Sequence, residues 1–227
     1  MPRRVKHLLW DWNGTLLDDV DACVVALNVL LRRRGLPAVN RARYVEVFDF
    51  PVRDYYRTMG FDLSSENWDA VALEFHAAYA ESAATAPLRL HAARVLRQLR
   101  DTGWRHSILS ASEQGLLMQM VSERGILDAF DHILGREDFQ AHSKIEQGHR
   151  LLATLGLAPC EVLLIGDTGH DREVARAIGC RCLLVANGHC DPARLAACGA
   201  PIVHDLPEVI VYLGRQLKSW FPSPEPS

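Results

Sequence analysis

Polar side chains follow three apolar runs of the kind that form buried strands. Asp11 follows the run at residues 5–10, Ser110 ends a second run, and Asp167 follows a third at residues 161–166. The carboxyl ends of strands in an open parallel α/β sheet meet at one edge, and ligands bind there. We therefore expect Asp11, Ser110 and Asp167 to converge on one site. The alternative for Asp11 is an ordinary turn residue before a helix.

Two aspartates in one site predict a cation, because like charges that lie close together are costly without one between them. Carboxylate oxygens in an open site favour Mg²⁺, which keeps some of its waters and binds substrate phosphate. Ser110 can donate a hydrogen bond to a phosphoryl oxygen. Lys144, one of only three lysines in the chain, can bind phosphate and stabilise charge in the transition state. The alternative for Lys144 is an exposed helix start.

A sheet is needed to position these residues, and the pattern from residue 90 onward predicts one. Apolar runs alternate there with segments of helical periodicity, which is typical of βαβ units. We expect an α/β fold with a Rossmann-like, doubly wound parallel sheet. The expected strands are residues 5–10, 105–110, 131–134, 161–165, 181–186 and 201–203. The expected helices are residues 91–100, 113–124, 144–155, 172–178, 192–198 and 207–217.

The segment at residues 17–88 shows helical patterns and no clear strand, which predicts a small all-helical cap inserted after the first strand. One helix is expected over residues 18–34, and another over residues 65–83 with Ser64 or Ser65 as its N-cap. The expected domains are a core of residues 1–16 and 89–221, a cap of residues 17–88 and a disordered tail of residues 222–227.

The composition is ordinary for a globular protein, with 48% hydrophobic and 23% charged residues among 227. A net charge of −3 argues against a nucleic-acid partner. No apolar run reaches membrane-spanning length and no signal-peptide pattern is present, so we expect a cytoplasmic protein without a membrane partner. The six cysteines form no paired CxxC set and are expected to be reduced. No feature of the sequence specifies an oligomeric state.

Taken in order, four segments resemble the four motifs of the haloacid dehalogenase superfamily. They are Asp11-Trp12-Asn13-Gly14-Thr15, Ser110, Lys144 and Gly166-Asp167-Thr168-Gly169-His170-Asp171. The last segment, with residues 174–179, is similar to the phosphatase branch, especially to phosphoglycolate phosphatase-like members. The resemblance covers residues 5–16 and 90–215. It implies a Mg²⁺-dependent phosphatase that hydrolyses a small phosphorylated metabolite under a mobile cap.

The resemblance also implies roles for individual residues. Asp11 would be the nucleophile that forms an aspartyl-phosphate, with Asn13 and Lys144 as the other catalytic residues. Mg²⁺ would be held by Asp11, the backbone carbonyl of Asn13, Asp167 and Asp171. The residues expected to bind phosphate are Gly14, Thr15, Ser110, Ala111 and Lys144. In the cap, Arg53 is expected to contact a substrate anion, because it follows the helix break at Phe50-Pro51 in a segment that should face the site. The alternative for Arg53 is an ordinary surface arginine.

Asn13 departs from the pattern, because phosphatases of this superfamily usually carry there an aspartate that protonates the leaving group. An amide has no titratable proton near neutral pH, and losing a general acid typically costs about 10²–10⁴-fold in rate. Several hypotheses stay open: substrates with good leaving groups, such as acyl phosphates or pyrophosphates; another proton donor, His170 or a cap residue; a phosphate-ester binding or regulatory protein with little turnover; or a phosphotransferase.

The sequence disfavours two related reactions of this superfamily, because the residues that they need are missing or differ. Phosphonoacetaldehyde hydrolases need a cap lysine for a Schiff base, and the sequence has no lysine between Lys6 and Lys144. Haloalkanoate dehalogenases work without metal and lack the aspartate-rich last motif that here contains Asp167 and Asp171. Phosphoester hydrolysis therefore remains the favoured reaction.

Overall fold

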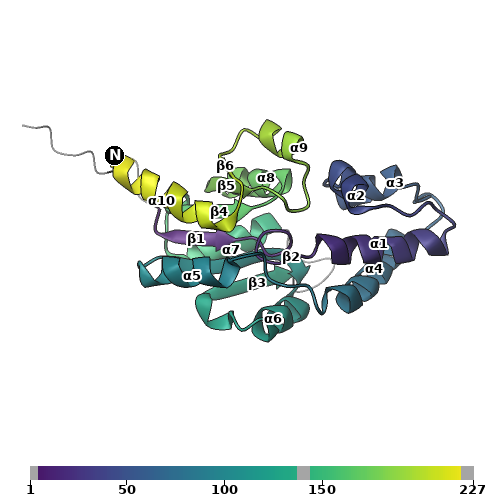
Figure 1. The fold of residues 1–227 in the computed structure, drawn as a ribbon, viewed down its shortest axis with the longest axis horizontal. Helices are drawn as coiled ribbons and strands as arrows, with labels where there is room; N and C mark the ends of the chain where they lie inside the picture. Colours follow the sequence, from purple (N-terminus) through teal and green to yellow (C-terminus); the bar gives the residue numbers. More distant parts are fainter. Residues whose placement is uncertain (1–4, 137–143, 221–227) are drawn as a thin grey trace, which may run out of the picture.

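The computed structural model describes residues 5–136 and 144–220, so the predicted tail at residues 222–227 lies outside the described residues. Its strands are all parallel and form one sheet in the order β3-β2-β1-β4-β5-β6 (Figure 1). This order confirms the predicted doubly wound α/β sheet. The strands are β1 (His7–Trp10), β2 (Arg105–Glu113), β3 (His132–Arg136), β4 (Val162–Gly166), β5 (Arg181–Val185) and β6 (Ile202–Val203).

Alternating apolar side chains give the sheet two buried faces. In β1, Leu8 and Trp10 belong to one hydrophobic cluster and Leu9 to another, and all three are fully buried. A sheet that is apolar on both faces is typical of parallel α/β folds. Helices α5 (Ala92–Asp101), α6 (Gln114–Glu123) and α10 (Leu206–Trp220) cover the first face. Helices α7 (Lys144–Leu155), α8 (Gly169–Ile178) and α9 (Pro192–Ala197) cover the second.

The strand order reverses at β1. The chain adds β2 and β3 on one side of β1 and then β4, β5 and β6 on the other. Trp10 pairs with Ile165 in β4, and the Asp11 backbone N–H donates to the Ile165 carbonyl at 2.8 Å. The crevice at such a reversal is where doubly wound sheets bind ligands. The fold therefore brings Asp11 and Asp167, which follow β1 and β4, to the same crevice.

Four helices inserted after β1 pack around a hydrophobic cluster of their own and lie to one side of the sheet (Figure 1). The chain leaves and re-enters the core through adjacent segments, since Leu17 and Leu88 form an isolated antiparallel bridge. These contacts support the cap limits of residues 17–88, which we retain as a proposal. The helices are α1 (Val20–Arg33), α2 (Arg41–Val47), α3 (Val52–Thr58) and α4 (Trp68–Ala83).

Two local predictions are wrong. Helix α4 is capped by Asn67, whose side chain accepts two backbone N–H bonds, and not by Ser64 or Ser65. Strand β2 continues to Glu113, so Ser110 lies inside the strand rather than at its end. Pairing with β3 sustains the longer strand, and it includes a register shift that a single-sequence pattern does not reveal.

Short 3₁₀ turns, η1 (Leu127–Ala129) and η2 (Pro159–Glu161), precede β3 and β4. All six cysteines are free. Within residues 5–136 and 144–220, none of the helices combines the length and the apolarity needed to cross a membrane.

Candidate active site

Lys144 and two aspartates form a buried charged group at the carboxyl edge of the sheet. Lys144 Nζ donates to Asp11 Oδ1 at 2.6 Å and to Asp171 Oδ1 at 2.7 Å. Asp11 follows β1, Lys144 is the first residue of α7, and Asp171 lies in the first turn of α8. All three side chains are buried. Lys144 is therefore not the exposed helix start of the alternative hypothesis.

Asp167 is held beside this group by hydrogen bonds from Thr15 and His189 and by the close approach of two glycine residues. Its Oδ1 accepts from the Thr15 hydroxyl at 2.9 Å and its Oδ2 from the His189 backbone N–H at 2.6 Å. A Cβ atom added at Gly14 or Gly188 would lie 2.3 Å or 2.0 Å from Asp167 Oδ2. Gly14 also has a φ of +69°, which L side chains rarely adopt. Gly14 and Thr15 thus position Asp167.

Three carboxylates share a single ammonium group in this site. The pKa values of Asp11 and Asp167 are raised, whereas burial of Asp171 is outweighed by Lys144, which lowers the Asp171 pKa. Burial raises the pKa of Asp11 to about 8; Lys144 opposes the rise, and Asp171 and Asp167 add to it. Burial also raises the pKa of Asp167 to about 6, against the attraction of His189. Burial disfavours the charge on Lys144, but Asp11 and Asp171 outweigh it and raise the Lys144 pKa. A further cation would allow all three carboxylates to ionise.

The donor set fits Mg²⁺. Each of Asp11, Asp167 and Asp171 offers one carboxylate oxygen, and these oxygens lie within 4.8 Å of one another. Mg²⁺ prefers such hard oxygen ligands, and its charge would remove the repulsion that opposes ionisation of Asp11 and Asp167. Asn13 could add its backbone carbonyl, which follows Asp11 by two residues.

Asn13 has its side-chain amide held from both ends. Its Nδ2 donates to Asp19 Oδ2 and to the Tyr79 hydroxyl, each at 2.7 Å, and its Oδ1 accepts from the Ser112 hydroxyl at 2.7 Å. Asp19 fixes the orientation of the amide, because an ionised carboxylate accepts and cannot donate. An aspartate at position 13 would place a second carboxylate oxygen against Asp19. This contact favours the amide over a carboxylate.

Asp19 and His189 form a buried ion pair that the sequence analysis did not identify. His189 Nε2 lies 3.1 Å from Asp19 Oδ1, and His189 Nδ1 lies 3.0 Å from the Tyr44 hydroxyl in α2. Burial opposes both charges, but Asp19 outweighs it and raises the pKa of His189 to about 9. His189, Asn13 and Tyr79 likewise outweigh burial and lower the pKa of Asp19 to about 2.

One sequence signal could have identified His189. It follows β5, so the rule that singled out Asp11 and Asp167 at the carboxyl ends of strands applies to it as well. Asp19 offers no comparable signal. It stands next to Asp18 at the start of α1, where acidic residues are common, and only its tertiary contacts distinguish it.

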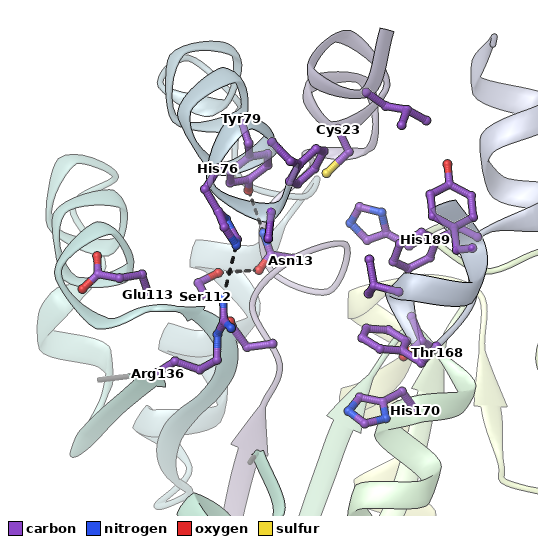
Figure 2. A pocket seen from close by; sticks show the side chains of 18 of the residues that line it. Asn13, Cys23, His76, Tyr79, Ser112, Glu113, Arg136, Thr168, His170 and His189 are labelled. Carbon is purple, nitrogen blue, oxygen red and sulfur yellow. Dashed lines mark hydrogen bonds between the residues drawn. The ribbon is translucent and has the colours of Figure 1, made fainter. Parts of the chain in front are cut away.

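A cavity of about 540 Å³ lies between this sheet edge and the cap. Figure 2 shows His76, Tyr79, Ser112 and Arg136 on one side of it and His189, Thr168 and His170 on the other. Six of the predicted site residues line it: Asp11, Asn13, Ala111, Lys144, Asp167 and Asp171.

Ser110 is brought close to this surface but is not part of it. Its side chain is fully buried, and its Oγ accepts the backbone N–H of Ser112 at 3.0 Å. Ala111 and Ser112 line the cavity in its place. Ser110 thus supports the backbone of β2 next to the cavity, and its predicted contact with phosphate remains a proposal.

Arg53 is not brought to the site, although the sequence analysis expected it to contact a substrate anion. It is exposed, and within the described part of the chain it does not belong to the cavity lining. Helix α3 presents Val52 and Tyr55 to the cavity instead. The arginine on the cavity wall is Arg136 at the end of β3, whose Nη2 lies 3.3 Å from His76 Nε2. Arg136 is distant in sequence from the cap, so no local pattern indicated it.

His170, a predicted alternative proton donor, lines the cavity rather than pointing away from it. Its ring stacks on Phe50 of the cap, with centroids 4.3 Å apart, and its Nδ1 lies 3.5 Å from Glu173 Oε2. This placement keeps His170 among the residues that a bound substrate could contact.

The fold and the site define a class of protein: a Rossmann-like α/β core with a helical cap and, at its strand reversal, a cluster of aspartates that could hold a metal ion. A family model described as haloacid dehalogenase-like hydrolase matches residues 8–185. The chain belongs to this family.

The relatives lie in the phosphoglycolate phosphatase-like branch. The phosphoglycolate phosphatase of Pectobacterium atrosepticum is 24% identical over 191 residues, 82% of each chain. An N-acetylmuramic acid 6-phosphate phosphatase of Pseudomonas aeruginosa is 28% identical over 230 residues, covering 94% of this chain and 97% of the relative. A predicted phosphatase from Clostridium acetobutylicum has the same fold, with a TM-score of 0.78, 17% identity, and coverage of 95% of this chain and 100% of its own.

Proposed function

We propose that this chain is a Mg²⁺-dependent phosphatase that hydrolyses a small phosphorylated metabolite through an aspartyl-phosphate on Asp11. The observation that carries the proposal is the buried group in which Lys144 bonds Asp11 and Asp171 while Asp167 lies close enough to share a cation. It combines a carboxylate nucleophile, a phosphate-binding ammonium group and metal ligands at one cavity. The phosphatase relatives support the same class of reaction.

The proposed reaction has two steps at phosphorus. The Asp11 carboxylate first attacks phosphorus, forming an oxygen–phosphorus bond while the bond to the leaving oxygen breaks. Water then attacks the phosphorus of the aspartyl-phosphate, which releases inorganic phosphate and restores Asp11. Lys144, 2.6 Å from Asp11 Oδ1, orients the nucleophile and places positive charge beside the phosphoryl oxygens.

Mg²⁺ would be held by Asp11, the Asn13 carbonyl and Asp167, with Asp171 as a further partner, and when bound it would polarise the phosphoryl group. Ser110 and Ala111, which lie within β2, are the proposed contacts for the remaining phosphoryl oxygens. Asn13 supplies no proton, so the leaving oxygen departs as an anion or takes its proton from another donor, with His170 as the candidate.

Phosphate release from a panel of phosphorylated compounds tests this function. The panel contains acetyl phosphate, 2-phosphoglycolate and N-acetylmuramic acid 6-phosphate. We expect turnover with Mg²⁺, loss of turnover with EDTA, and a decrease of about 10³-fold or more in Asp11→Asn. Asp21→Asn is the matched control, because Asp21 lies on the exposed side of α1 and the substitution is the same. Equal activity of wild type and Asp11→Asn would refute the proposal.

A second candidate, a phosphate-ester binding or regulatory protein, is favoured by one observation: the amide at position 13 is bonded to three partners and cannot protonate a leaving group. Binding of Mg²⁺ and a phosphate analogue without hydrolysis of any panel member would favour it. A phosphotransferase would instead accumulate phosphorylated Asp11, visible in the intact-protein mass. A cytoplasmic location and the absence of a nucleic-acid partner remain predictions from the sequence.

A further inference from the structure

We infer that the substrate is an aryl phosphate monoester, whose ring occupies the aromatic part of the cavity and whose leaving group is a phenolate. The inference rests on the proposed phosphatase function and specifies its substrate class. Two independent observations lead to it: the aromatic wall that the cap presents to the acidic site, and the amide that stands where a proton donor is needed.

The cavity is large and mostly apolar on its cap side. Its volume of about 540 Å³ falls in the range of pockets that enclose drug-sized ligands, about 300–1,000 Å³. Phe48, Phe50, Trp68 and Phe75 line it and are each partly exposed. A two-carbon leaving group such as glycolate would leave most of this aromatic surface in contact with water, whereas an aromatic ring would cover it.

The aromatic wall is continuous with the residues that flank the carboxylates. Phe50 stacks on His170, the residue before Asp171, with a centroid distance of 4.3 Å and an interplanar angle of 20°. Phe48 lies against His189, with ring centroids 5.4 Å apart. A phosphorylated ring could therefore place its phosphate among the aspartates while its faces meet aromatic side chains at ordinary stacking or edge distances.

Polar side chains on the opposite wall already have partners within the protein. Ser112 Oγ donates to Asn13, Arg136 Nε donates to the Ala111 carbonyl at 2.6 Å, and the Glu113 carboxylate accepts the backbone N–H groups at the start of α6. A polyhydroxylated leaving group would have to compete for these groups or lose hydrogen bonds to water, and either change costs binding energy. An aryl group needs few such partners.

Asn13 gives a separate chemical reason for the same class. When Asp11 attacks, the bond between phosphorus and the leaving oxygen breaks and its electron pair stays on that oxygen. Asn13 has no acidic proton to give. A phenol, with a pKa of about 10, leaves as a phenolate far more readily than an alcohol whose acidity is close to that of water, about 15.7. Solvent can protonate the phenolate after release.

A matched series of substrates tests the inference on the Mg²⁺-loaded full chain. Phenyl phosphate and cyclohexyl phosphate have similar size but different leaving groups, and 2-naphthyl phosphate extends the ring. We expect kcat/KM for phenyl phosphate to exceed that for cyclohexyl phosphate by at least about 10²-fold, and KM to be lower for the naphthyl ester. Equal turnover of the phenyl and cyclohexyl esters would overturn the inference.

Acetyl phosphate separates failure of the inference from failure of the proposed function. It is small and has a good leaving group, so a phosphatase with this site should hydrolyse it whether or not the cavity binds a ring. Hydrolysis of acetyl phosphate without hydrolysis of the aryl esters overturns the aryl assignment alone. Hydrolysis of neither, with intact Mg²⁺ binding, overturns both.

Substitution of the aromatic wall provides the second test. Phe75→Ala should raise KM for 2-naphthyl phosphate about 3- to 10-fold, by loss of a ring contact, and should lower the preference for the naphthyl ester over acetyl phosphate. Phe75→Leu keeps the cap filled and should show the same change in preference if Phe75→Ala folds poorly. Phe130→Ala is the control, since Phe130 packs on the core away from this cavity and should leave the preference unchanged. An unchanged preference in both Phe75 variants would contradict the inference.

Discussion

At the scale of single residues, the side chains of Asn13 and Asp19 complement each other as hydrogen-bond donor and acceptor. The amide of Asn13 donates to Asp19, Tyr79 donates to the same carboxylate oxygen, and His189 balances its charge. The sequence alone suggests that Asn13→Asp would restore a general acid and raise hydrolysis of alkyl phosphates. The structure changes this expectation, because the new carboxylate would face Asp19 at the distance of a hydrogen bond.

We predict that Asn13→Asp alone lowers Tm and gains little activity. In the exchanged double variant, Asn13→Asp with Asp19→Asn, the amide at position 19 can donate a hydrogen bond to the carboxylate at position 13, so the repulsion is avoided. The exchanged protein should hydrolyse cyclohexyl phosphate about 10²-fold faster than wild type, the lower end of what a general acid contributes. Thermal unfolding and initial rates measure the two effects.

Asp19→Asn alone is the control for this exchange, because it sets two amide groups against each other without adding an acid. The interpretation would be wrong if Asn13→Asp matched the double variant in both Tm and rate.

At the scale of elements, neighbouring strands β1 and β2 carry two buried histidines beneath the site. Trp10 Nε1 donates to His106 Nδ1 at 2.9 Å, and His7 Nε2 lies 2.8 Å from Ser107 Oγ. Burial lowers the pKa of both histidines to about 4. Protonated His106 would present an N–H to the Trp10 N–H, so the strand pair requires the neutral imidazole.

This requirement predicts acid destabilisation with a defined sign. The folded pKa of His106 lies below the unfolded value of 6.5, so its contribution to stability is complete above pH 6.5 and is lost as the pH falls towards 4. This difference between the folded and unfolded pKa values of His106 lowers the free energy of unfolding by about 2 kcal/mol between pH 7 and pH 5. Urea unfolding at the two pH values should show that His106→Asn, which can still accept from Trp10, loses about 2 kcal/mol less than wild type. His204→Asn, at an exposed position, should lose as much as wild type, and a similar loss in all three proteins would contradict the argument.

The helix and strand pattern was predictable where local sequence decides it. Helix α7 begins at Lys144 and ends at Leu155, as predicted, because its apolar residues repeat at helical spacing and Gly156 follows. The N-cap of α4 was not predictable in the same way. Ser64, Ser65 and Asn67 are all good N-cap residues, and in the structure it is the Asn67 side chain that accepts the backbone N–H groups of Asp69 and Ala70.

At the scale of the whole molecule, the site exists only between two separately packed parts. The aspartates and Lys144 come from the sheet edge, while the aromatic wall comes from the cap, which has a hydrophobic cluster of its own. Asp19 and His189 join these parts, since Asp19 starts the cap and His189 follows β5. Metal and substrate should therefore affect the stability of the entire chain.

We predict that Mg²⁺ raises Tm, because it relieves repulsion among Asp11, Asp167 and Asp171. A concentration one hundred times Kd contributes about 2.7 kcal/mol, which corresponds to roughly 5–10 °C for a chain of this length. Differential scanning calorimetry with Mg²⁺ or EDTA measures the shift. Asp167→Asn should remove most of it and Asp21→Asn none, and an equal shift in Asp167→Asn would show that the ion binds elsewhere.

The sequence by itself determined the parallel α/β sheet, the helical insertion, and the convergence of Asp11 and Asp167. These follow from periodicity and from the rule that parallel strands end at one edge. The sequence alone also predicts the site residues Asp11, Asn13, Lys144, Asp167 and Asp171, because they stand in ordered motifs that resemble those of the haloacid dehalogenase superfamily.

Only the tertiary structure shows which cap residues face the site, and only its contacts explain why an amide suits position 13. Arg53 looked suitable by its place after a helix break, but the cavity wall takes Arg136 from β3. Asp19 looked like an ordinary acid at a helix start, and its role depends on His189, which is distant in sequence. These placements depend on contacts between segments that are remote in sequence. In a buried site an unpaired charge is costly, so each charged side chain needs a partner there. The local sequence does not indicate which remote residue that partner is.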